Sequence, residues 1–206
     1  VANVATLADI TAQCGITVTT IPTATDNCSG TINATTTSPL TYNTQGTYTI
    51  TWTYTDAAGN ATTQTQNVTI LDNTAPVPNV ATLSDITGQC GVTVTTVPTA
   101  TDNCSGAITA TTTDPLTYSA QGTYTITWSY TDAVGNVSTQ TQKVIVLDNI
   151  APVADLSTLP DITGQCGVTV TTVPTATDNC SGVINSTTTS PLTYSAQGTY
   201  TITWRY

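Results

Sequence analysis

The residues with the clearest chemical potential in this sequence are its six cysteines. They form two columns that repeat every 76 residues, Cys14, Cys90 and Cys166 in the first and Cys28, Cys104 and Cys180 in the second. Paired cysteines at a fixed spacing are typical of disulfides formed in an oxidising, extracellular compartment. A metal or redox site is the alternative, but the chain has neither histidine nor a Cys-x-x-Cys motif.

The shared period favours one local bond in every repeat. We therefore predict the pairs Cys14–Cys28, Cys90–Cys104 and Cys166–Cys180. In the first repeat, residues 15–21 would run out and residues 22–28 would run back, so that the two sulfur atoms meet. Closing so short a loop is worth about 3 kcal/mol in chain entropy.

Aspartate is the second residue type with a pattern, since every acidic residue is Asp and ten of the twelve recur at equivalent positions. The recurring columns are Asp9, Asp85 and Asp161; Asp26, Asp102 and Asp178; Asp56 and Asp132; and Asp72 and Asp148. One interpretation is that these residues form turns by accepting hydrogen bonds from nearby backbone.

The other interpretation of the aspartates is calcium binding where two repeats join. In an immunoglobulin-like sandwich, the incoming linker, the loop after the second strand and the last hairpin turn share one end. Oxygen ligands gathered there suit Ca²⁺. The candidate ligands are Asp72, Asn73, Asp102, Asn103 and Asp132 at the first joint, and Asp148, Asn149 and Asp178 at the second. The arrangement is similar to cadherin junctions but lacks their glutamates, and both interpretations stay open.

Catalysis is disfavoured by the composition. Without histidine there is no ordinary base to activate a nucleophile, and Lys143 and Arg205 are the only cations in a chain of formal charge −10. We therefore expect no enzyme. So acidic a chain offers no surface for phosphates, which excludes nucleic acid and anionic membranes as partners. No run of about 18 apolar residues is present for membrane insertion.

Strands must position these residues. Residues 46–54 alternate strictly, with Tyr48, Ile50, Trp52 and Tyr54 on one face and Thr on the other, which predicts a half-buried strand. A turn at residues 56–60 and a second alternating segment, residues 61–71, complete a hairpin. With about six or seven short strands and no helical period, each repeat is predicted to be a β-sandwich.

The domain organisation follows from the period. We predict repeat 1 at residues 1–76, repeat 2 at 77–152 and repeat 3 at 153–206, the last truncated so that its final strand is missing. The chain is therefore expected to be an excerpt from a longer one. Pro76 restricts the linker, which predicts tandem immunoglobulin-like sandwiches stacked end to end as an extended rod.

Four separated motifs resemble the hyalin repeat (HYR) type of immunoglobulin-like module. They are Gln13-Cys14-Gly15, residues 22–30 with the sequence PTATDNCSG, residues 54–60 with YTDAAGN, and residues 71–76 with LDNTAP. Such modules commonly carry a second cysteine pair, which this chain lacks. Tandem, Thr-rich, acidic versions look like the repeats of giant surface adhesins of gliding bacteria. This resemblance implies export by a dedicated secretion system and attachment to a surface or filament.

We therefore expect a structural stalk or filament shaft of a large secreted cell-surface adhesin. The expected partners are anchoring or secretion machinery, and neighbouring copies in a filament. The alternative is that each repeat is itself an adhesive module for glycans or proteins. That alternative needs exposed aromatic residues, for which Tyr42, Tyr118 and Tyr194 are the candidates, although the same residues could belong to the core.

Overall fold

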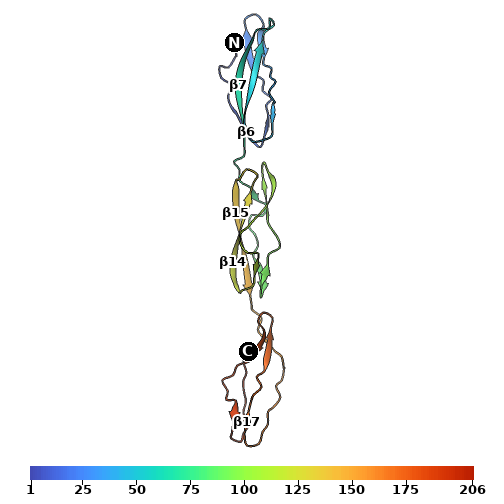
Figure 1. The fold of residues 1–206 in the computed structure, drawn as a ribbon, viewed down its shortest axis with the longest axis vertical. Coiled ribbons are helices and arrows are strands. Elements are labelled where there is room, and N and C mark those ends of the chain that lie inside the picture. The colour runs from blue at the N-terminus through green and yellow to red at the C-terminus, as the bar shows by residue number, and fades with distance from the viewer. The chain divides into compact units, whose positions relative to one another are not determined.

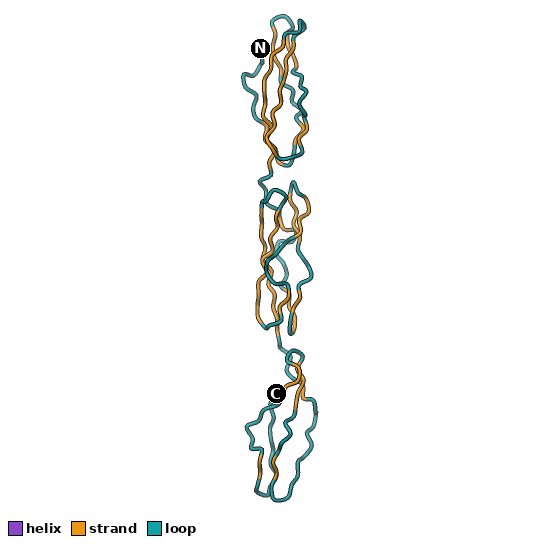
Figure 2. Tube along the Cα trace, in the orientation of Figure 1, coloured by secondary structure: helices purple, strands orange, loops and turns teal.

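The protein consists of β-strands and loops throughout. The computed structural model describes residues 1–206, and no helix occurs in it (Figure 2). The all-β prediction is confirmed. Contacts divide the chain into two compact units, residues 1–82 with 97–112 and 128–140, and residues 83–96 with 113–127 and 141–206. Each unit contains one junction between successive repeats, and the predicted repeat boundaries themselves stay a prediction.

The long hairpin of repeat 1 lies where the alternating pattern predicts it (Figure 1). Strand β6 (Gly46–Thr55) pairs with the antiparallel strand β7 (Ala61–Leu71), and β1 (Ile10–Gln13) joins the other edge of β7 in parallel. Ile50, Trp52 and Tyr54 on β6 are buried, and the threonines between them face outward. Because successive side chains of a strand point to opposite faces, β6 presents one apolar face, and this face packs on the core.

Shorter strands complete repeat 1. Strands β3 (Thr23–Asp26) and β4 (Gly30–Asn33) form a hairpin, β2 (Ile16–Thr17) pairs with β5 (Thr41–Tyr42), and a single bridge links Thr35 to Thr53 of β6. The core contains Val18, Ala24, Ala34, Tyr42, Ile50, Trp52, Tyr54, Val68 and Ile70. It is small, as the sequence indicates, so covalent cross-links matter for stability.

Repeats 2 and 3 follow the same order of strands. Repeat 2 contains β8 (Val77–Pro78), β9 (Ile86–Gln89), β10 (Val92–Thr93), β11 (Thr99–Asp102), β12 (Gly106–Thr109), β13 (Thr117–Tyr118), β14 (Gly122–Thr131) and β15 (Val137–Leu147). Repeat 3 contains β16 (Val153–Ala154), β17 (Val168–Thr169), β18 (Thr175–Asp178), β19 (Gly182–Asn185) and β20 (Thr193–Tyr194). Residues 198–204, the equivalents of β6, form no strand because no counterpart of β7 pairs with them.

Glutamines of the last long strand connect core aromatics to the first segment in repeats 1 and 2. Trp52 Nε1 donates to Gln66 Oε1 at 3.0 Å, and the Tyr54 hydroxyl donates to Gln64 Oε1 at 2.9 Å. The amide nitrogens of both glutamines donate in turn to carbonyls of residues 4, 5 and 8. This network satisfies the polar ends of buried aromatics, and the sequence interpretation did not include it.

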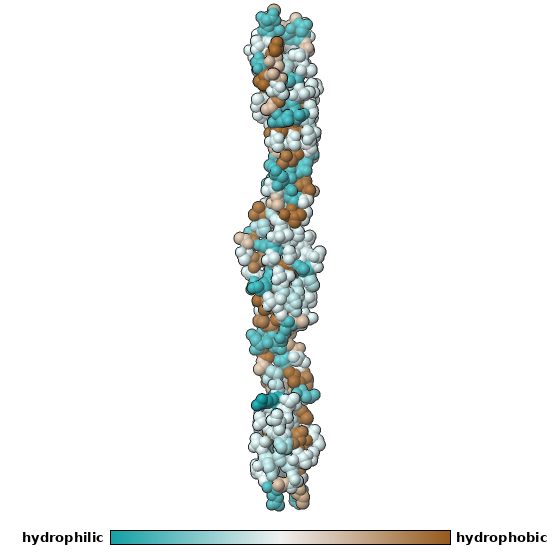
Figure 3. All heavy atoms as spheres, turned by 90° about the vertical axis from the view of Figure 1, so that its left-hand side faces the viewer, coloured by the Kyte–Doolittle hydropathy of each residue, from teal (hydrophilic) through white to brown (hydrophobic).

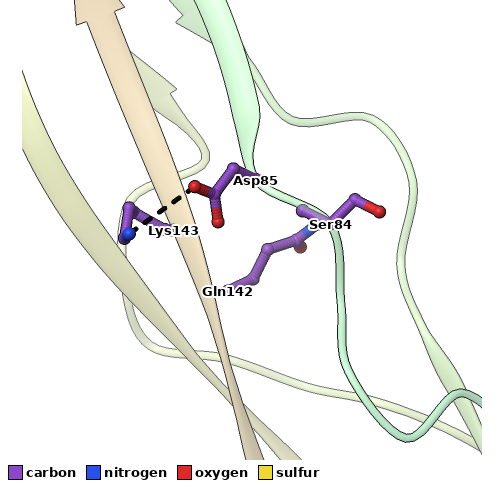
Figure 4. Close-up of polar contacts among 4 residues, drawn as sticks. All are labelled: Ser84, Asp85, Gln142 and Lys143. Atoms are coloured by element: carbon purple, nitrogen blue, oxygen red, sulfur yellow. Dashed lines mark hydrogen bonds and ion pairs between the residues drawn. The ribbon is translucent and has the colours of Figure 1, made fainter.

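Repeat 2 shows the equivalent contact together with an ion pair (Figure 4). Gln142 Nε2 on β15 donates to the carbonyl of Ser84 at 3.0 Å, and the neighbouring Lys143 Nζ lies 3.5 Å from Asp85 Oδ2. Both side chains of this ion pair are about half exposed, so the pair adds little to stability. The pair nevertheless matters for charge, because Lys143 is one of only two cationic side chains in the sequence.

One face of the surface is mostly polar or neutral (Figure 3). On the face drawn in Figure 3, hydrophilic and near-neutral residues predominate and hydrophobic residues lie between them. Exposed apolar side chains include Val77, Val137 and Val183. No helix of the structure is long and apolar enough to cross a bilayer.

Cross-linked junctions between repeats as the candidate functional site

The cysteines join successive repeats, so the predicted pairing within each repeat is wrong. Cys14 is bonded to Cys104 and Cys90 to Cys180, each across 90 residues of sequence, with Cα atoms 4.9 Å apart. Cys28 and Cys166 are free and exposed. The first cysteine of one repeat therefore pairs with the second cysteine of the next.

The reason lies in the length of the strands. The Cys14 amide donates to the carbonyl of Leu71 at 3.1 Å, at the end of β7, whereas the Ser29 hydroxyl accepts from the Ala57 amide at 3.2 Å, beside the start of β7. Eleven residues of strand separate these points, about 33 Å. The chain between Cys14 and Cys28 crosses the repeat once instead of turning back, and the two cysteines lie at opposite ends.

The loop that presents the first cysteine has an unusual backbone. Cys14, Cys90 and Cys166 have φ of 63°, 63° and 67°, in the left-handed region that residues other than glycine rarely adopt. A Cβ atom on the following Gly15 would lie 2.7 Å from the carbonyl oxygen of Tyr42, so glycine is required there. Because the unbonded Cys166 shares this conformation, the local sequence sets the loop and not the disulfide.

The loop that presents the second cysteine is a turn built on aspartate. Asp102 Oδ1 accepts the backbone amides of Cys104 and Ser105 at 2.9 and 2.7 Å. Asp26 makes the same contacts in repeat 1, where the amides of Ser29 and Cys28 hold the pKa of Asp26 below its usual range. This confirms that turn formation is one role of the aspartates.

The Asp132 column forms turns as well. Its Oδ1 accepts the amides of Val134, Gly135 and Asn136, and its Oδ2 accepts the Asn136 side chain at 2.7 Å. Burial raises the pKa of Asp132, but the hydrogen bonds from Asn136 and the turn amides outweigh it, so the pKa lies below its usual range. With both oxygens engaged, Asp132 is held as a turn residue.

The turn at Asp132 and the residues after it also form hydrogen bonds to the linker. Asn136 Nδ2 donates to the carbonyls of Asp72 and Thr74 at 3.2 and 3.4 Å, and the Ser138 hydroxyl donates to the carbonyl of Pro76. The first junction is therefore held by backbone, a disulfide and these hydrogen bonds. Neither Asn136 nor Ser138 was proposed as a functional residue from the sequence. Both follow Asp132 closely in the sequence, and this short separation from the turn was a signal that could have identified them.

The predicted calcium ligands divide into two groups. Asp72 and Asp102 lie together beside Cys104, and Asp148 and Asp178 lie together beside Cys180. The asparagines lie elsewhere. Asn73 Oδ1 accepts from Gln13 Nε2, and Asn149 Oδ1 accepts from Gln89 Nε2, both at 2.6 Å.

Asn103 lies against the disulfide. Its Nδ2 donates toward the sulfur atoms of Cys14 and Cys104 at 3.3 and 3.1 Å, and Asn179 repeats this contact at the second junction. The amide thus covers the cross-link on one side. Linker and loop lie together at each junction, as predicted from the order of strands, but only the carboxylates share one site.

The new pairing predicts a simple peptide map. Cleavage before every Asp places all six cysteines in different peptides, at residues 9–25, 26–55, 85–101, 102–113, 161–177 and 178–206. Without reduction, mass spectrometry should find peptide 9–25 joined to 102–113 and peptide 85–101 joined to 178–206. The other two should carry free thiols that an alkylating reagent labels. A bond joining 9–25 to 26–55 would contradict the structure.

Comparison with protein families decides the classification. The family model described as an HYR-like domain with 4 cysteines matches residues 2–70 and again residues 74–146. The chain belongs to this family. Each match contains only two cysteines in this chain, Cys14 and Cys28 in the first and Cys90 and Cys104 in the second. In each matched segment this HYR-like chain thus has two cysteines where the family description has four, and these two do not bond to each other.

A relative with a longer sequence supports the same classification. Hyalin of Strongylocentrotus purpuratus is 36% identical to the HYR-like chain over 208 residues, which covers 91% of this chain and 17% of hyalin. The chain thus spans about a sixth of the length of that relative. The gliding-bacterial setting expected from the sequence stays a prediction.

Solved structures with some likeness are cadherin-type ectodomains. The protocadherin GammaB4 extracellular domain has 15% identity and a TM-score of 0.35, covering 94% of this chain and 42% of that one. Mouse cadherin-23 EC22-24 has 15% identity and a TM-score of 0.33, with coverages of 86% and 76%. Likeness at this level carries no argument about function.

Proposed function

We propose that these repeats are a load-bearing shaft within a large cell-surface adhesion protein. The observation that supports this is the disulfide at each of the two junctions, Cys14–Cys104 and Cys90–Cys180. A domain that acts alone needs no covalent link to its neighbour beyond the linker. A chain that transmits force gains from one, because the link bypasses the folded domain. Disulfides of this kind also support an extracellular location for the chain.

The two bonds create a short covalent route through the repeats. From Cys14 the route crosses to Cys104, returns along 14 residues to Cys90, and crosses again to Cys180. Force applied along the chain follows this shorter route. The remaining residues between Cys14 and Cys90, and between Cys104 and Cys180, are shielded, so repeat 2 cannot unravel while both bonds are intact.

The free cysteines extend the same rule beyond this segment. Cys166 belongs to the first column and Cys28 to the second, and both are exposed. We propose that Cys28 pairs with a first-column cysteine of a preceding copy and Cys166 with a second-column cysteine of a following copy. Every junction of the array would then carry one bond, whether the copies lie in one chain or in neighbouring molecules of a filament.

The aromatic residues argue against the alternative of an adhesive module. Tyr42 and Tyr118 are 6% and 8% exposed, and each packs against a second tyrosine of its repeat, with ring centroids 4.6 and 4.5 Å apart. Burial raises the pKa of Tyr42, with a smaller contribution from Tyr48. In repeats 1 and 2 these rings serve the core and offer no exposed platform for a carbohydrate. In repeat 3 the third candidate, Tyr194, is half-buried and stacks on Tyr200, which is 48% exposed, so buried rings disfavour the adhesive module only in the first two repeats.

A binding assay separates the two functions. The oxidised 206-residue chain should show no saturable binding to a glycan array or to a plain surface when labelled and applied alone. A reduced, alkylated sample serves as the control for exposed hydrophobic patches. Saturable binding of the oxidised chain to one glycan class, lost in the control, would contradict the shaft and support the adhesive module.

A further inference from the structure

Two carboxylate oxygens at the first junction are buried without any hydrogen-bond donor. Asp102 is 4% exposed, and its Oδ2 has no partner, nor does the buried Oδ2 of Asp72. The other oxygen of each residue is engaged, Oδ1 of Asp102 by the Cys104 and Ser105 amides and Oδ1 of Asp72 by the Thr74 amide at 3.2 Å. Each unpartnered oxygen therefore belongs to a carboxylate whose other oxygen accepts at least one backbone amide.

The two carboxylates converge from different repeats. Asp72 comes from the linker that leaves repeat 1, Asp102 from the turn between β11 and β12 of repeat 2, and their ligand atoms lie within 4.8 Å of each other and of Cys104 Sγ. The disulfide at Cys104 fixes this turn against repeat 1. Like charges held so close in a buried place repel each other unless a positive charge lies between them.

The second junction repeats the arrangement. Asp148 and Asp178 lie within the same limit beside Cys180, Asp178 is 5% exposed, and the buried Asp148 Oδ1 has no hydrogen-bond partner. Asp178 Oδ1 again accepts the two turn amides, from Cys180 and Ser181. The same pair of carboxylates therefore occurs at both cross-linked junctions, with two unpartnered buried oxygens at the first and one, Asp148 Oδ1, at the second.

The chain has no cation of its own to neutralise these pairs. Lys143 is paired with Asp85 (Figure 4), and the Arg205 backbone bridges to Thr187 in repeat 3. No other Lys, Arg or His exists in the sequence. The Val1 ammonium donates to the Thr25 carbonyl in repeat 1, so a cation at either site has to come from solution.

We propose that each junction binds one Ca²⁺ ion between these carboxylates, Asp72 with Asp102 and Asp148 with Asp178. Oxygen donors suit a hard cation, whereas the neighbouring sulfur is in a disulfide and is no thiolate for a soft metal. Two carboxylates with water completing the shell give a weak site, matched to the ~10⁻⁴–10⁻³ M affinities of extracellular modules. Asp132, Asn73 and Asn103 are not ligands.

Repeat 1 supplies a matched control. Asp26 forms the same turn as Asp102, with amide contacts at 2.9 and 2.8 Å, but no linker aspartate precedes it in this chain, since Asp9 is the only acidic residue before it. Asp26→Asn therefore removes the same charge from the same turn without touching a junction. Asn keeps a carbonyl oxygen, so each turn retains its acceptor.

The test is calcium titration of the oxidised 206-residue chain by isothermal calorimetry after chelator treatment. Two equivalents of Ca²⁺ should bind. Asp102→Asn and Asp178→Asn should each lose one equivalent, the double variant should lose both, and Asp26→Asn should retain two. Asp72 and Asp148 lie in the linkers and do not form these turns. Asp72→Asn and Asp148→Asn therefore check the assignment if circular dichroism shows that a turn variant misfolds.

Three results would overturn the proposal. The wild-type chain would bind no calcium at 5–10 mM free ion, well above the ~1 mM limit expected of such a site. Alternatively, the junction variants would retain both equivalents. Finally, Asp26→Asn would weaken binding as much as Asp102→Asn, which would mean that calcium responds only to the net charge of the chain.

Discussion

Pulled from its two ends, the oxidised chain is expected to lengthen far less than its number of residues allows. Between Cys14 and Cys180 the backbone contains 166 residues, about 580 Å when extended, but the route through both disulfides contains only 14, about 50 Å. Those 14 residues already cross about 33 Å of a folded repeat. Little length therefore remains to be released.

Single-molecule force spectroscopy on the full chain measures this directly. A variant with Cys14, Cys104, Cys90 and Cys180 all replaced by Ser should release about 530 Å more contour length than the wild type. The matched control is Cys28→Ser with Cys166→Ser, which removes two thiols but leaves both junction bonds, and it should behave as the wild type. Equal extension of the wild type and the fourfold variant would refute the load-bearing shaft.

Replacing Trp52 by Ala should cost about 3–5 kcal/mol of unfolding free energy. The indole is 1% exposed in the core of repeat 1, and its Nε1 donates to Gln66, so the substitution leaves both a cavity and an unsatisfied acceptor. A loss of this size is a large fraction of the stability of a small domain. Denaturant unfolding followed by near-ultraviolet circular dichroism should show a separate, earlier transition.

Thr51→Ala is the matched control for this experiment. Thr51 is the neighbour of Trp52 on β6 but faces outward and is exposed, and its contacts to Ser38 and Thr36 use backbone atoms. Its substitution should change the free energy by less than about 0.5 kcal/mol. If the two variants unfolded together, the burial of the β6 apolar face would be wrong.

The long hairpin could be predicted because its signal is local. Strict alternation over residues 46–54 places Ile50, Trp52 and Tyr54 on one face, and the structure buries all three. The turn at residues 56–60 is likewise local, since Asp56 accepts the amides of Ala58 and Asn60. In both cases neighbouring residues contain the whole cause.

The paired carboxylates were predictable in part. The order of strands and linker brings Asp72 to Asp102, because a sandwich has only two ends and the linker must enter at one. The sequence did not reveal which oxygens would lack donors. The backbone amides of each turn decide that, by engaging both oxygens of Asp132 but only one of Asp102.

The sequence by itself determined that six cysteines recur in two columns suited to regular cross-links, and only the tertiary structure decided which cysteines bond and between which repeats. The spacing in sequence limits the distance between Cys14 and Cys28. It does not determine whether the segment between them turns back or crosses the repeat. Residues 15–28 cross the repeat in extended form, so Cys14 ends beside Leu71 and Cys28 beside Ala57, a full strand length apart. The nearest partner for Cys14 is then Cys104 of the next repeat, because the linker brings that turn to the same end.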